Sequence, residues 1–277
     1  MNADHHWPLT YLFVPGNRPE RFVKALDSGA DRVIIDLEDA VSPVAKADAR
    51  QAIAAWMGGG ATVLRERVLI RINDAGTPWH VDDLALIKTV NPACVMLPKC
   101  ESAAQVADLM LALTPDACVL PLIETARGIM ALPDIAGATG VARLAFGSLD
   151  YMADMGIPAG SPALDFAAAQ IAIASRAAGI ASPVAGVTPD IDAARVSADM
   201  AQARDLGFGA KMCIHPSQIA AVRAALAPVA AELAWAQRVL QAWTASAGGA
   251  IQLDGKMVDR PVVLRAERIV AMAAQSI

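Results

Sequence analysis

Short apolar runs alternate with amphipathic stretches along most of this chain. Each run is rich in aliphatic residues and is followed by a turn or polar cluster, then by apolar positions at helical spacing. The eight apolar runs are 11–14, 33–36, 68–72, 94–97, 118–123, 144–146, 184–187 and 211–214. The eight helix-like stretches are 18–28, 44–57, 80–89, 102–113, 125–136, 163–178, 189–206 and 216–226. Apolar strands that alternate with helices predict a parallel sheet with both faces buried.

Eight strand–helix units in a chain of 277 residues favour an α/β fold of the (β/α)8 TIM-barrel type. The alternative is a doubly wound open sheet. Such a sheet usually carries a G-x-G-x-x-G fingerprint after its first strand, and the sequence VPGNRP at 14–19 does not match it. The pattern therefore predicts the barrel.

The alternation of apolar runs and helix-like stretches ends after about residue 228. A long Ala-rich helix is predicted over 229–245, the pair Gly248-Gly249 breaks the chain, and a last helix is predicted over 261–274. We therefore divide the chain into a barrel catalytic domain over 1–228 and a C-terminal helical extension over 229–277. A hinge followed by a compact charged segment is typical of a lid or an oligomerisation contact. A plain cap on the barrel is the alternative.

Composition narrows the class of protein. The chain is 55% hydrophobic but only 4% aromatic, so its core is aliphatic. A net charge of −5 without a long basic run argues against a nucleic-acid partner. No apolar run reaches about 18 residues, and no basic segment leads into an apolar one at the N-terminus, so we expect neither a membrane span nor a secretion signal. The four cysteines show no C-x-x-C spacing, which suits buried thiols in a reducing cytoplasm.

Polar and ionisable residues follow the apolar runs on most of the predicted strands. Active sites of (β/α)8 barrels lie at the C-terminal ends of the strands, so these residues are predicted to meet at one rim. Helix N-caps account for Ser102, Thr125 and Ser217. They do not account for the long side chains of Arg71 and Lys99 at the ends of buried strands. This convergence indicates an enzyme.

Two carboxylates are candidate metal ligands. Glu124 directly follows the run 118–123, and Asp150 lies just beyond the run 144–146. Two adjacent parallel strands joined by a helix would bring both to the same rim, although they are 150 − 124 = 26 residues apart. Two hard oxygen ligands, with room for water and a chelating substrate, suit Mg²⁺. The alternative is a solvated loop acid and a helix N-cap Asp.

Arg71 and Lys99 would place positive charge at this rim. Arg71 offers a planar fork for a substrate carboxylate or a thioester oxygen. Its alternative is an ion pair with the acidic cluster of Asp36, Glu38 and Asp39. Lys99 suits a Schiff-base role, since barrel aldolases can place such a lysine on a strand end. Against this, neighbouring carboxylates keep an amine protonated rather than nucleophilic.

Eight ordered motifs carry a resemblance to a known family. The motifs are LFVPGNRPERF at 12–22, DLEDAV at 36–41, RIN at 71–73, LPK at 97–99, PLIETARG at 121–128, FGSLDY at 146–151, KMCIHPSQI at 211–219 and DGKMVD at 254–259. Over nearly the whole chain they resemble the citrate lyase β-subunit-like branch of the HpcH/HpaI aldolase superfamily. The resemblance implies a Mg²⁺-dependent (β/α)8 barrel that assembles as a homotrimer or hexamer. It also implies cleavage or formation of a carbon–carbon bond in a β-hydroxyacyl-CoA thioester such as malyl-, citramalyl- or citryl-CoA, which separates into an acyl-CoA and a keto acid.

The same resemblance implies roles for individual residues. Glu124 and Asp150 would bind Mg²⁺ beside the substrate, and Arg71 would hold the reacting carbonyl or carboxylate. Asp259, the last residue of DGKMVD, matches the acid/base that relatives deliver from a neighbouring subunit. The residues that fall where relatives contact the CoA portion are Phe13, Arg21 and Lys24.

Departures from the family pattern bear on the substrate, and two other functions remain open. Leu9 stands where many relatives have an Arg, and Ala185 stands where the seventh-strand motif often carries an Asp. One alternative function is a pyruvate-type class II aldolase acting on free hydroxy-keto acids. That branch typically carries a His after its second-strand acid, where this chain has Asp39-Ala40. The other is a non-catalytic subunit, against which the complete set of candidate catalytic residues argues.

Overall fold

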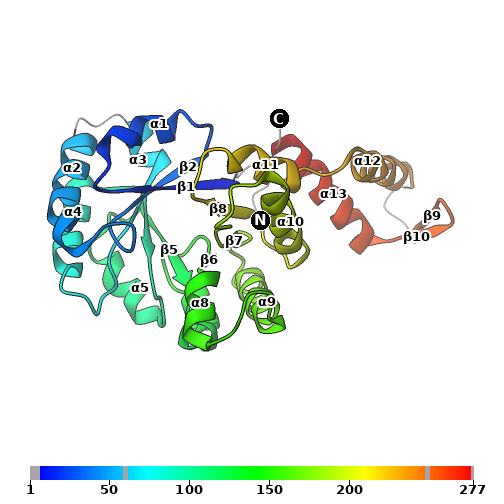
Figure 1. Ribbon diagram of the computed structural model, residues 1–277. Coiled ribbons are helices and arrows are strands. Elements are labelled where there is room, and N and C mark those ends of the chain that lie inside the picture. Colours follow the sequence, from blue (N-terminus) through cyan, green and yellow to red (C-terminus); the bar gives the residue numbers. More distant parts are fainter. Residues whose placement is uncertain (1–6, 59–61, 247–249, 276–277) are drawn as a thin grey trace. The chain divides into compact units, whose positions relative to one another are not determined.

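A closed parallel barrel forms the larger part of the molecule (Figure 1). The computed structural model describes residues 7–58, 62–246 and 250–275. Eight strands pair in sequence order, and the last pairs with the first. The strands are β1 Thr10–Pro15, β2 Arg32–Asp36, β3 Val68–Arg71, β4 Cys94–Leu97, β5 Cys118–Ile123, β6 Ala145–Phe146, β7 Val184–Ala185 and β8 Ala210–Cys213. Helices lie outside this sheet, so the predicted (β/α)8 barrel is confirmed.

Alternate side chains of the strands fill the barrel interior. The buried interior cluster consists of Tyr11, Ile34, Leu69, Met96, Leu120, Leu122, Ala145, Val184, Ala210 and Met212. Because successive side chains point to opposite faces of a strand, the intervening residues face the surrounding helices. Both faces are therefore buried, which explains why the strands read as near-continuous apolar runs in the sequence.

Short helices connect the strands. In chain order they are the 3-10 helix η1 Pro19–Arg21, α1 Phe22–Leu26, the 3-10 helix η2 Pro43–Ala45, α2 Lys46–Gly58, α3 Thr62–Arg67, α4 His80–Val90, α5 Ala103–Met110, α6 Ala126–Met130, α7 Leu132–Ala136, α8 Ser148–Met155, α9 Pro162–Ala177, α10 Ala193–Asp205 and α11 Gln218–Leu226. The predicted N-caps Ser102 and Thr125 are confirmed, because their side chains accept from the N–H groups of Gln105 and Gly128. Helices α3 and α8 have no counterpart among the predicted helices. Helix α8 matters for function because it begins two residues after β6 and carries Asp150.

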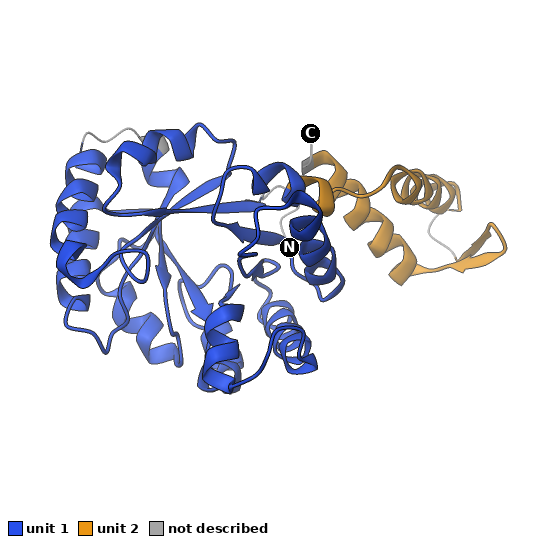
Figure 2. Ribbon diagram, viewed as in Figure 1, with its two compact units in different colours: residues 1–222 blue, residues 223–277 orange. Residues whose placement is uncertain are grey.

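The chain divides into two compact units, Met1–Val222 and Arg223–Ile277 (Figure 2). The sequence pattern places the boundary at residue 228. The second unit contains α12 Ala230–Ala245, the antiparallel strands β9 Ile251–Leu253 and β10 Lys256–Val258, and α13 Arg260–Gln275. Both helices share a small apolar core with the hairpin. The members of this core that are most buried are Ala236, Val239, Val258, Val263, Ala266 and Ile269.

The hairpin of the second unit was not predicted from the sequence. Its turn residues Asp254 and Gly255 both adopt left-handed backbone, with φ of 52° and 76°. Asp-Gly is the pair that a tight hairpin turn favours, because both central residues need positive φ. The predicted break at Gly248-Gly249 lies outside the described residues.

One stretch of the described residues, Gln218–Ala245, has the length and hydropathy of a membrane span. This is weak evidence, because apolar helices of water-soluble proteins pass the same test. The stretch comprises α11 and α12, which are separated by a break at 227–229. Pro228 lacks a backbone N–H, and Val229 is extended with ψ of 152°, so the helical hydrogen bonding is interrupted there.

Candidate active site

Glu124 directly follows the last residue of β5 and directly precedes Thr125, the N-cap of α6. Its side chain is buried, with a residue exposure of 2%. Oε1 accepts a hydrogen bond from the backbone N–H of Lys99 at 2.7 Å, whereas buried Oε2 has no hydrogen-bond partner among the described residues. Burial raises the pKa of Glu124 to about 8, and the charge of Glu38 acts in the same direction. An orphaned carboxylate oxygen of this kind indicates a place for a cation.

Asp150 approaches this carboxylate from the next strand–helix connection. Strands β5 and β6 are parallel neighbours, with Ile123 opposite Phe146, so α8 begins on the same rim as Glu124. Asp150 is exposed in the first turn of α8, and its charge contributes to the raised pKa of Glu124. The structure therefore brings the two predicted metal ligands together.

Gly147 makes this approach possible. A Cβ at this position would lie 2.4 Å from Oε2 of Glu124, although the backbone of Gly147 has an ordinary φ of −85°. The glycine is needed for space rather than for conformation. The Glu124 side chain thus lies in a cradle formed by the chain just before α8.

The carboxylate pair fits a hard divalent cation. Glu124 supplies an unpartnered oxygen and Asp150 an exposed one, and both are oxygen ligands of the kind Mg²⁺ prefers. Among the described residues no group of three or more His, Cys, Asp or Glu side chains forms a metal site. Mg²⁺ often uses only one or two protein carboxylates and completes its coordination with water and substrate oxygens. The residues present therefore fit this ion.

Arg71 lies at the end of β3 and pairs with Asp36, the last residue of β2, and with Glu38 just beyond it, which is the ion-pair alternative of the sequence analysis. Its Nε and Nη2 donate to the two oxygens of Asp36, both at 2.7 Å, and Nη1 lies 2.9 Å from Oε2 of Glu38. The guanidinium also stacks over the ring of Phe13 at 5.0 Å from its centroid. Burial lowers the pKa of Arg71, but the charge of Asp36 and its hydrogen bonds more than offset this, so the pKa is raised. Since an arginine has five N–H donors, this fixed cation retains N–H groups for a substrate oxygen.

Lys99 links the acidic cluster to Glu124. Its backbone lies in the left-handed region, with φ of 45°, which turns its N–H toward Glu124. Its Nζ donates to Oε1 of Glu38 at 2.8 Å. Burial lowers the pKa of Lys99, but Glu38 and then Glu124 outweigh it, so the pKa is raised. A protonated amine in an ion pair does not form a Schiff base, and this geometry favours a charge-pairing role.

A buried polar network behind the rim was missed by the sequence analysis. Nζ of Lys46, in the first turn of α2, donates to the carbonyls of Leu37 and Glu38 and to Oδ1 of Asn73, all within 2.8 Å. Asn73 is held in turn by the buried carboxylate of Asp83, at 2.6 Å from Nδ2. Lys46 thus fixes the backbone that carries the acidic cluster. Its position in an amphipathic helix gives no sign of this role in the sequence.

The remaining candidate residues lie at two other places. Arg21 and Lys24 are exposed on η1 and α1, directly after β1. Arg21 lies 3.9 Å from the carboxylate of Glu20, and both cations remain accessible to an anionic ligand. Asp259 belongs to the second unit, where its Oδ1 accepts from the N–H of Val262 in the first turn of α13.

The chain matches known proteins over almost its full length. The family model for HpcH/HpaI aldolase/citrate lyase matches residues 9–216. A citrate lyase subunit beta-like protein of Mycobacterium tuberculosis is 38% identical over 274 residues, which cover 96% of each chain. A (3S)-malyl-CoA thioesterase of Cereibacter sphaeroides is 28% identical over 267 residues, which cover 95% of this chain and 93% of the relative.

A solved structure is similar over both units of the chain. The crystal structure of CitE from Mycobacterium tuberculosis, in complex with magnesium, acetoacetate and coenzyme A, matches with a TM-score of 0.86 and 35% sequence identity. The match covers 98% of this chain and 100% of that chain. Fold and site together define a (β/α)8-barrel protein with one buried and one exposed carboxylate, Glu124 and Asp150, that suit a divalent cation. The chain belongs to the HpcH/HpaI aldolase/citrate lyase family.

Proposed function

We propose that this protein is a Mg²⁺-dependent carbon–carbon lyase that cleaves or forms a β-hydroxyacyl-CoA thioester. The observation that carries this proposal is the buried, unpartnered Oε2 of Glu124 beside Asp150, with the fixed cation Arg71 on the same rim. The family relationship and the magnesium and coenzyme A in the similar CitE structure support it. Candidate substrates are malyl-, citramalyl- and citryl-CoA.

Glu124 and Asp150 would hold the metal. A bound Mg²⁺ supplies Lewis-acid polarisation of the keto-acid oxygens. The other contributions to catalysis come from side chains and backbone groups of the protein. Glu124 is held at Oε1 by the N–H of Lys99, so Oε2 faces the site in a fixed orientation. Preorganised ligands of this kind need no rearrangement during the reaction.

Arg71 provides the second fixed charge. In the cleavage direction the β-hydroxyl group would lose its proton to water and become the carbonyl of the keto acid, while the bond between the α- and β-carbons breaks and its electron pair moves into a thioester enolate. The free N–H groups of Arg71 would donate to the developing enolate oxygen or to a substrate carboxylate. Asp36 and Glu38 hold the guanidinium through three contacts, and the ring of Phe13 packs against it. The arginine is therefore oriented before substrate binds.

Asp259 would handle the proton at the enolate carbon, delivering it in cleavage and removing it in synthesis. We assign Asp259 to the active site of a neighbouring subunit in a homotrimer or hexamer. The second unit of one subunit would then act as a lid on the barrel of its neighbour. The exposed cations Arg21 and Lys24 would pair with phosphates of CoA.

The experiment is an assay of purified protein with Mg²⁺ and each of the three thioesters, in which keto acid, acyl-CoA and free CoA thiol are measured separately. A lyase converts malyl-CoA into glyoxylate and acetyl-CoA without free thiol. Removal of Mg²⁺ with EDTA and the Glu124→Gln variant should each abolish turnover, whereas the exposed-site control Glu66→Gln should not. Activity on free hydroxy-keto acids alone would show an aldolase instead.

Hydrolysis of the thioester is a second candidate function, favoured by the similarity to a (3S)-malyl-CoA thioesterase. In that case malyl-CoA gives malate and free CoA thiol, with no glyoxylate. The same assay separates the two reactions because only hydrolysis releases the thiol. No product from any thioester or free acid would contradict an enzymatic function for these substrates.

A further inference from the structure

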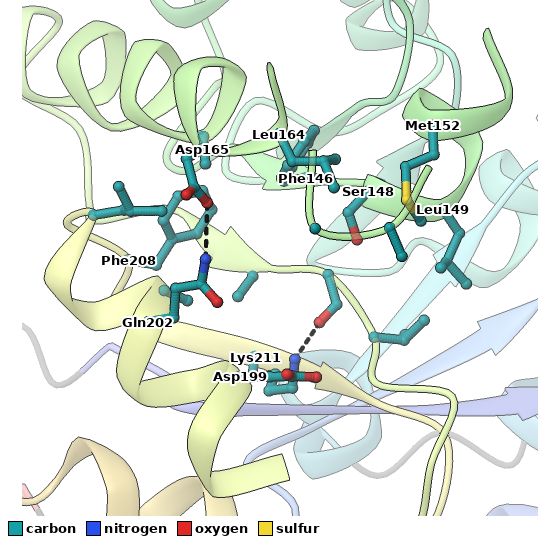
Figure 3. Close-up of a pocket in the computed structure, with 18 of the residues that line it drawn as sticks. Phe146, Ser148, Leu149, Met152, Leu164, Asp165, Asp199, Gln202, Phe208 and Lys211 are labelled. Atoms are coloured by element: carbon teal, nitrogen blue, oxygen red, sulfur yellow. Dashed lines mark hydrogen bonds between the residues drawn. The ribbon is translucent and has the colours of Figure 1, made fainter. Parts of the chain in front are cut away.

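A cavity lies outside the barrel sheet, and neither Glu124 nor Asp150 is among the residues that line it (Figure 3). It has a volume of about 420 Å³ and is bounded by β6, β7 and β8 on one side and by α8, α9 and α10 on the other. Phe146, Ala185 and Lys211 alternate with the inward-facing residues of their strands, so they point toward this helix layer. Exposed residues, among them Gly160 and Arg195, form the mouth of the cavity.

Lys211 places a buried ammonium group on the floor of this cavity. Its exposure is 4%, and the one hydrogen bond of its side chain to a described residue runs from Nζ to the carbonyl oxygen of Gly186 at 2.6 Å. It forms no ion pair with any residue that the structure describes. Burial lowers its pKa, and the charge of Asp199 offsets this only in part. Its register partner on β7 is Ala185, which has no charge to offer.

The carboxylates that line the same cavity are already engaged. Asp199 accepts from the hydroxyl of Thr188 at 2.7 Å and pairs with Nε of Arg195 at 3.0 Å. Asp165 accepts from Nε2 of Gln202 at 2.9 Å (Figure 3). Lys211 therefore has no ion-pair partner among the described residues, and the nearby charge of Asp199 offsets its burial only in part. Two of the three N–H donors of its ammonium group have no acceptor among these residues and are available to a ligand.

The walls between the mouth and Lys211 are largely apolar. The large apolar side chains are Phe146, Leu149, Met152, Leu164, Leu206 and Phe208. A cavity of 420 Å³ holds roughly fourteen water-sized groups at about 30 Å³ each. One buried cation at the end of an apolar cavity suits a ligand with a single anionic end and an apolar body.

We propose that this cavity binds a small monocarboxylate of about eight to ten non-hydrogen atoms in all, whose carboxylate pairs with Lys211 and whose apolar body lies against Phe146, Met152 and Leu164. The site uses neither of the proposed metal ligands, and it does not rest on the proposed lyase reaction. Its occupant touches Leu149 and Met152 of α8, the helix that also carries Asp150. Binding is therefore expected to affect the position of Asp150 at the rim.

The test uses hexanoate as the probe and the full-length protein in EDTA, so that carboxylate chelation at the metal pair plays no part. Met152 lines the cavity and serves as a local reporter through its ¹³C-labelled methyl group, which the variant Met152→Leu assigns. Hexanoate should shift the Met152 signal saturably, with a dissociation constant in the millimolar range or below. Lys211→Met should weaken this binding at least about tenfold. Lys88→Met makes the same change at an exposed lysine of α4 and should leave the binding unchanged.

Two further measurements keep the outcome decisive. 1-Hexanol, which lacks the charge, should bind to the parent protein more weakly than hexanoate does. In Lys211→Met the two compounds should bind equally well. Ala168→Leu fills the cavity from α9 and should abolish the shift even if Lys211→Met fails to fold. The proposal is overturned if hexanoate gives no saturable shift, if Lys211→Met binds it as well as the parent does, or if hexanol and hexanoate bind equally well to the parent.

Discussion

The Cα of Gly147 lies so close to the carboxylate of Glu124 that a methyl group on it would meet Oε2 at 2.4 Å and Cβ at 2.7 Å. The unpartnered Oε2 of Glu124 therefore depends on Gly147 for its position. The two residues follow β5 and β6, which are neighbouring strands of the barrel. Space at this position, rather than backbone freedom, is what the site requires.

Gly147→Ala should displace the Glu124 side chain and weaken Mg²⁺ binding about tenfold or more, comparable to the loss of a supporting contact at a metal site. Mg²⁺ titration calorimetry measures the effect. Gly58→Ala is the matched control, because a Cβ there meets nothing within 4 Å. Unchanged Mg²⁺ affinity in Gly147→Ala would contradict the prediction that the position of the Glu124 side chain, as Gly147 permits it, controls metal binding.

Two inactive variants should restore activity when they assemble together. Glu124→Gln damages the metal pair and Asp259→Asn the proposed acid/base in the second unit, so a mixed oligomer contains some sites with both residues intact. With random pairing of two chains at equal amounts, about a quarter of sites are complete. Lyase activity of co-expressed, doubly tagged protein is the measurement. No recovery, although mixed oligomers are isolated, would contradict delivery of Asp259 from a neighbouring subunit.

Lys46→Met should destabilise the protein and lower the turnover number. It leaves the carbonyls of Leu37 and Glu38 and Oδ1 of Asn73 without their donor, which costs about 2–4 kcal/mol in the free energy of unfolding. Urea unfolding gives the stability, and assay below the unfolding transition gives the turnover number. Lys88→Met on exposed α4 should change stability by less than about 0.5 kcal/mol. Equal stability of both variants would mean that the hydrogen bonds of Lys46 do not stabilise the folded protein.

Lys211 should make stability depend on pH in the alkaline range. Burial lowers its pKa below the ordinary value of the unfolded chain, so between the two values the unfolded state binds more protons and stability rises with pH. At pH below the lowered pKa the buried charge costs its full free energy in the parent and nothing in Lys211→Met. The stability difference between the two proteins should therefore shrink as pH rises through that window. Urea unfolding at several alkaline pH values measures it, and a constant difference would contradict the lowered pKa.

The cysteines should differ in reactivity within the native protein. Burial raises the pKa of Cys100 and of Cys213 to about 12, so at pH 8 roughly one thiol in ten thousand is ionised. The hydrogen bond from its strand neighbour Cys94 lowers the pKa of Cys118 instead. Iodoacetamide at pH 8 should modify Cys118 well before the two buried thiols, as peptide mass spectrometry will show. Unfolding in guanidinium should abolish the difference, and equal rates in the native state would refute it.

The barrel itself was predictable because each of its parts is a local pattern. A strand buried on both faces must be apolar at successive positions, and this applies from Val33 in β2 to Cys213 in β8. The rim followed from the same pattern, since the C-terminal ends of parallel strands meet at one side. Glu124 and Asp150 could therefore be paired from their places after two neighbouring strands.

Other features depend on contacts between distant segments, which no local pattern records. Whether Arg71 faces a substrate or an acid depends on the register that sets Asp36 opposite it on β2. Lys46 resembles any first-turn lysine until the chain places Asn73 against it. Nor does the sequence show that the helix layer leaves a cavity over Lys211.

The sequence by itself determined the order of strands and helices, the aliphatic core and which strand ends carry charge, because apolar periodicity and turn residues act over a few positions. Only the tertiary structure decided which charges are neutralised and which stay unpartnered. Glu124 directly follows β5 and Lys211 lies within β8. The carboxylate of Glu124 nevertheless lies at the rim near Asp150, with Oε2 unpartnered among the described residues, whereas Nζ of Lys211 lies on the side of the helix layer and donates to the carbonyl oxygen of Gly186. The physical reason is that burial and charge pairing depend on distances of a few ångströms between segments far apart in the chain, and closure of the barrel sets those distances.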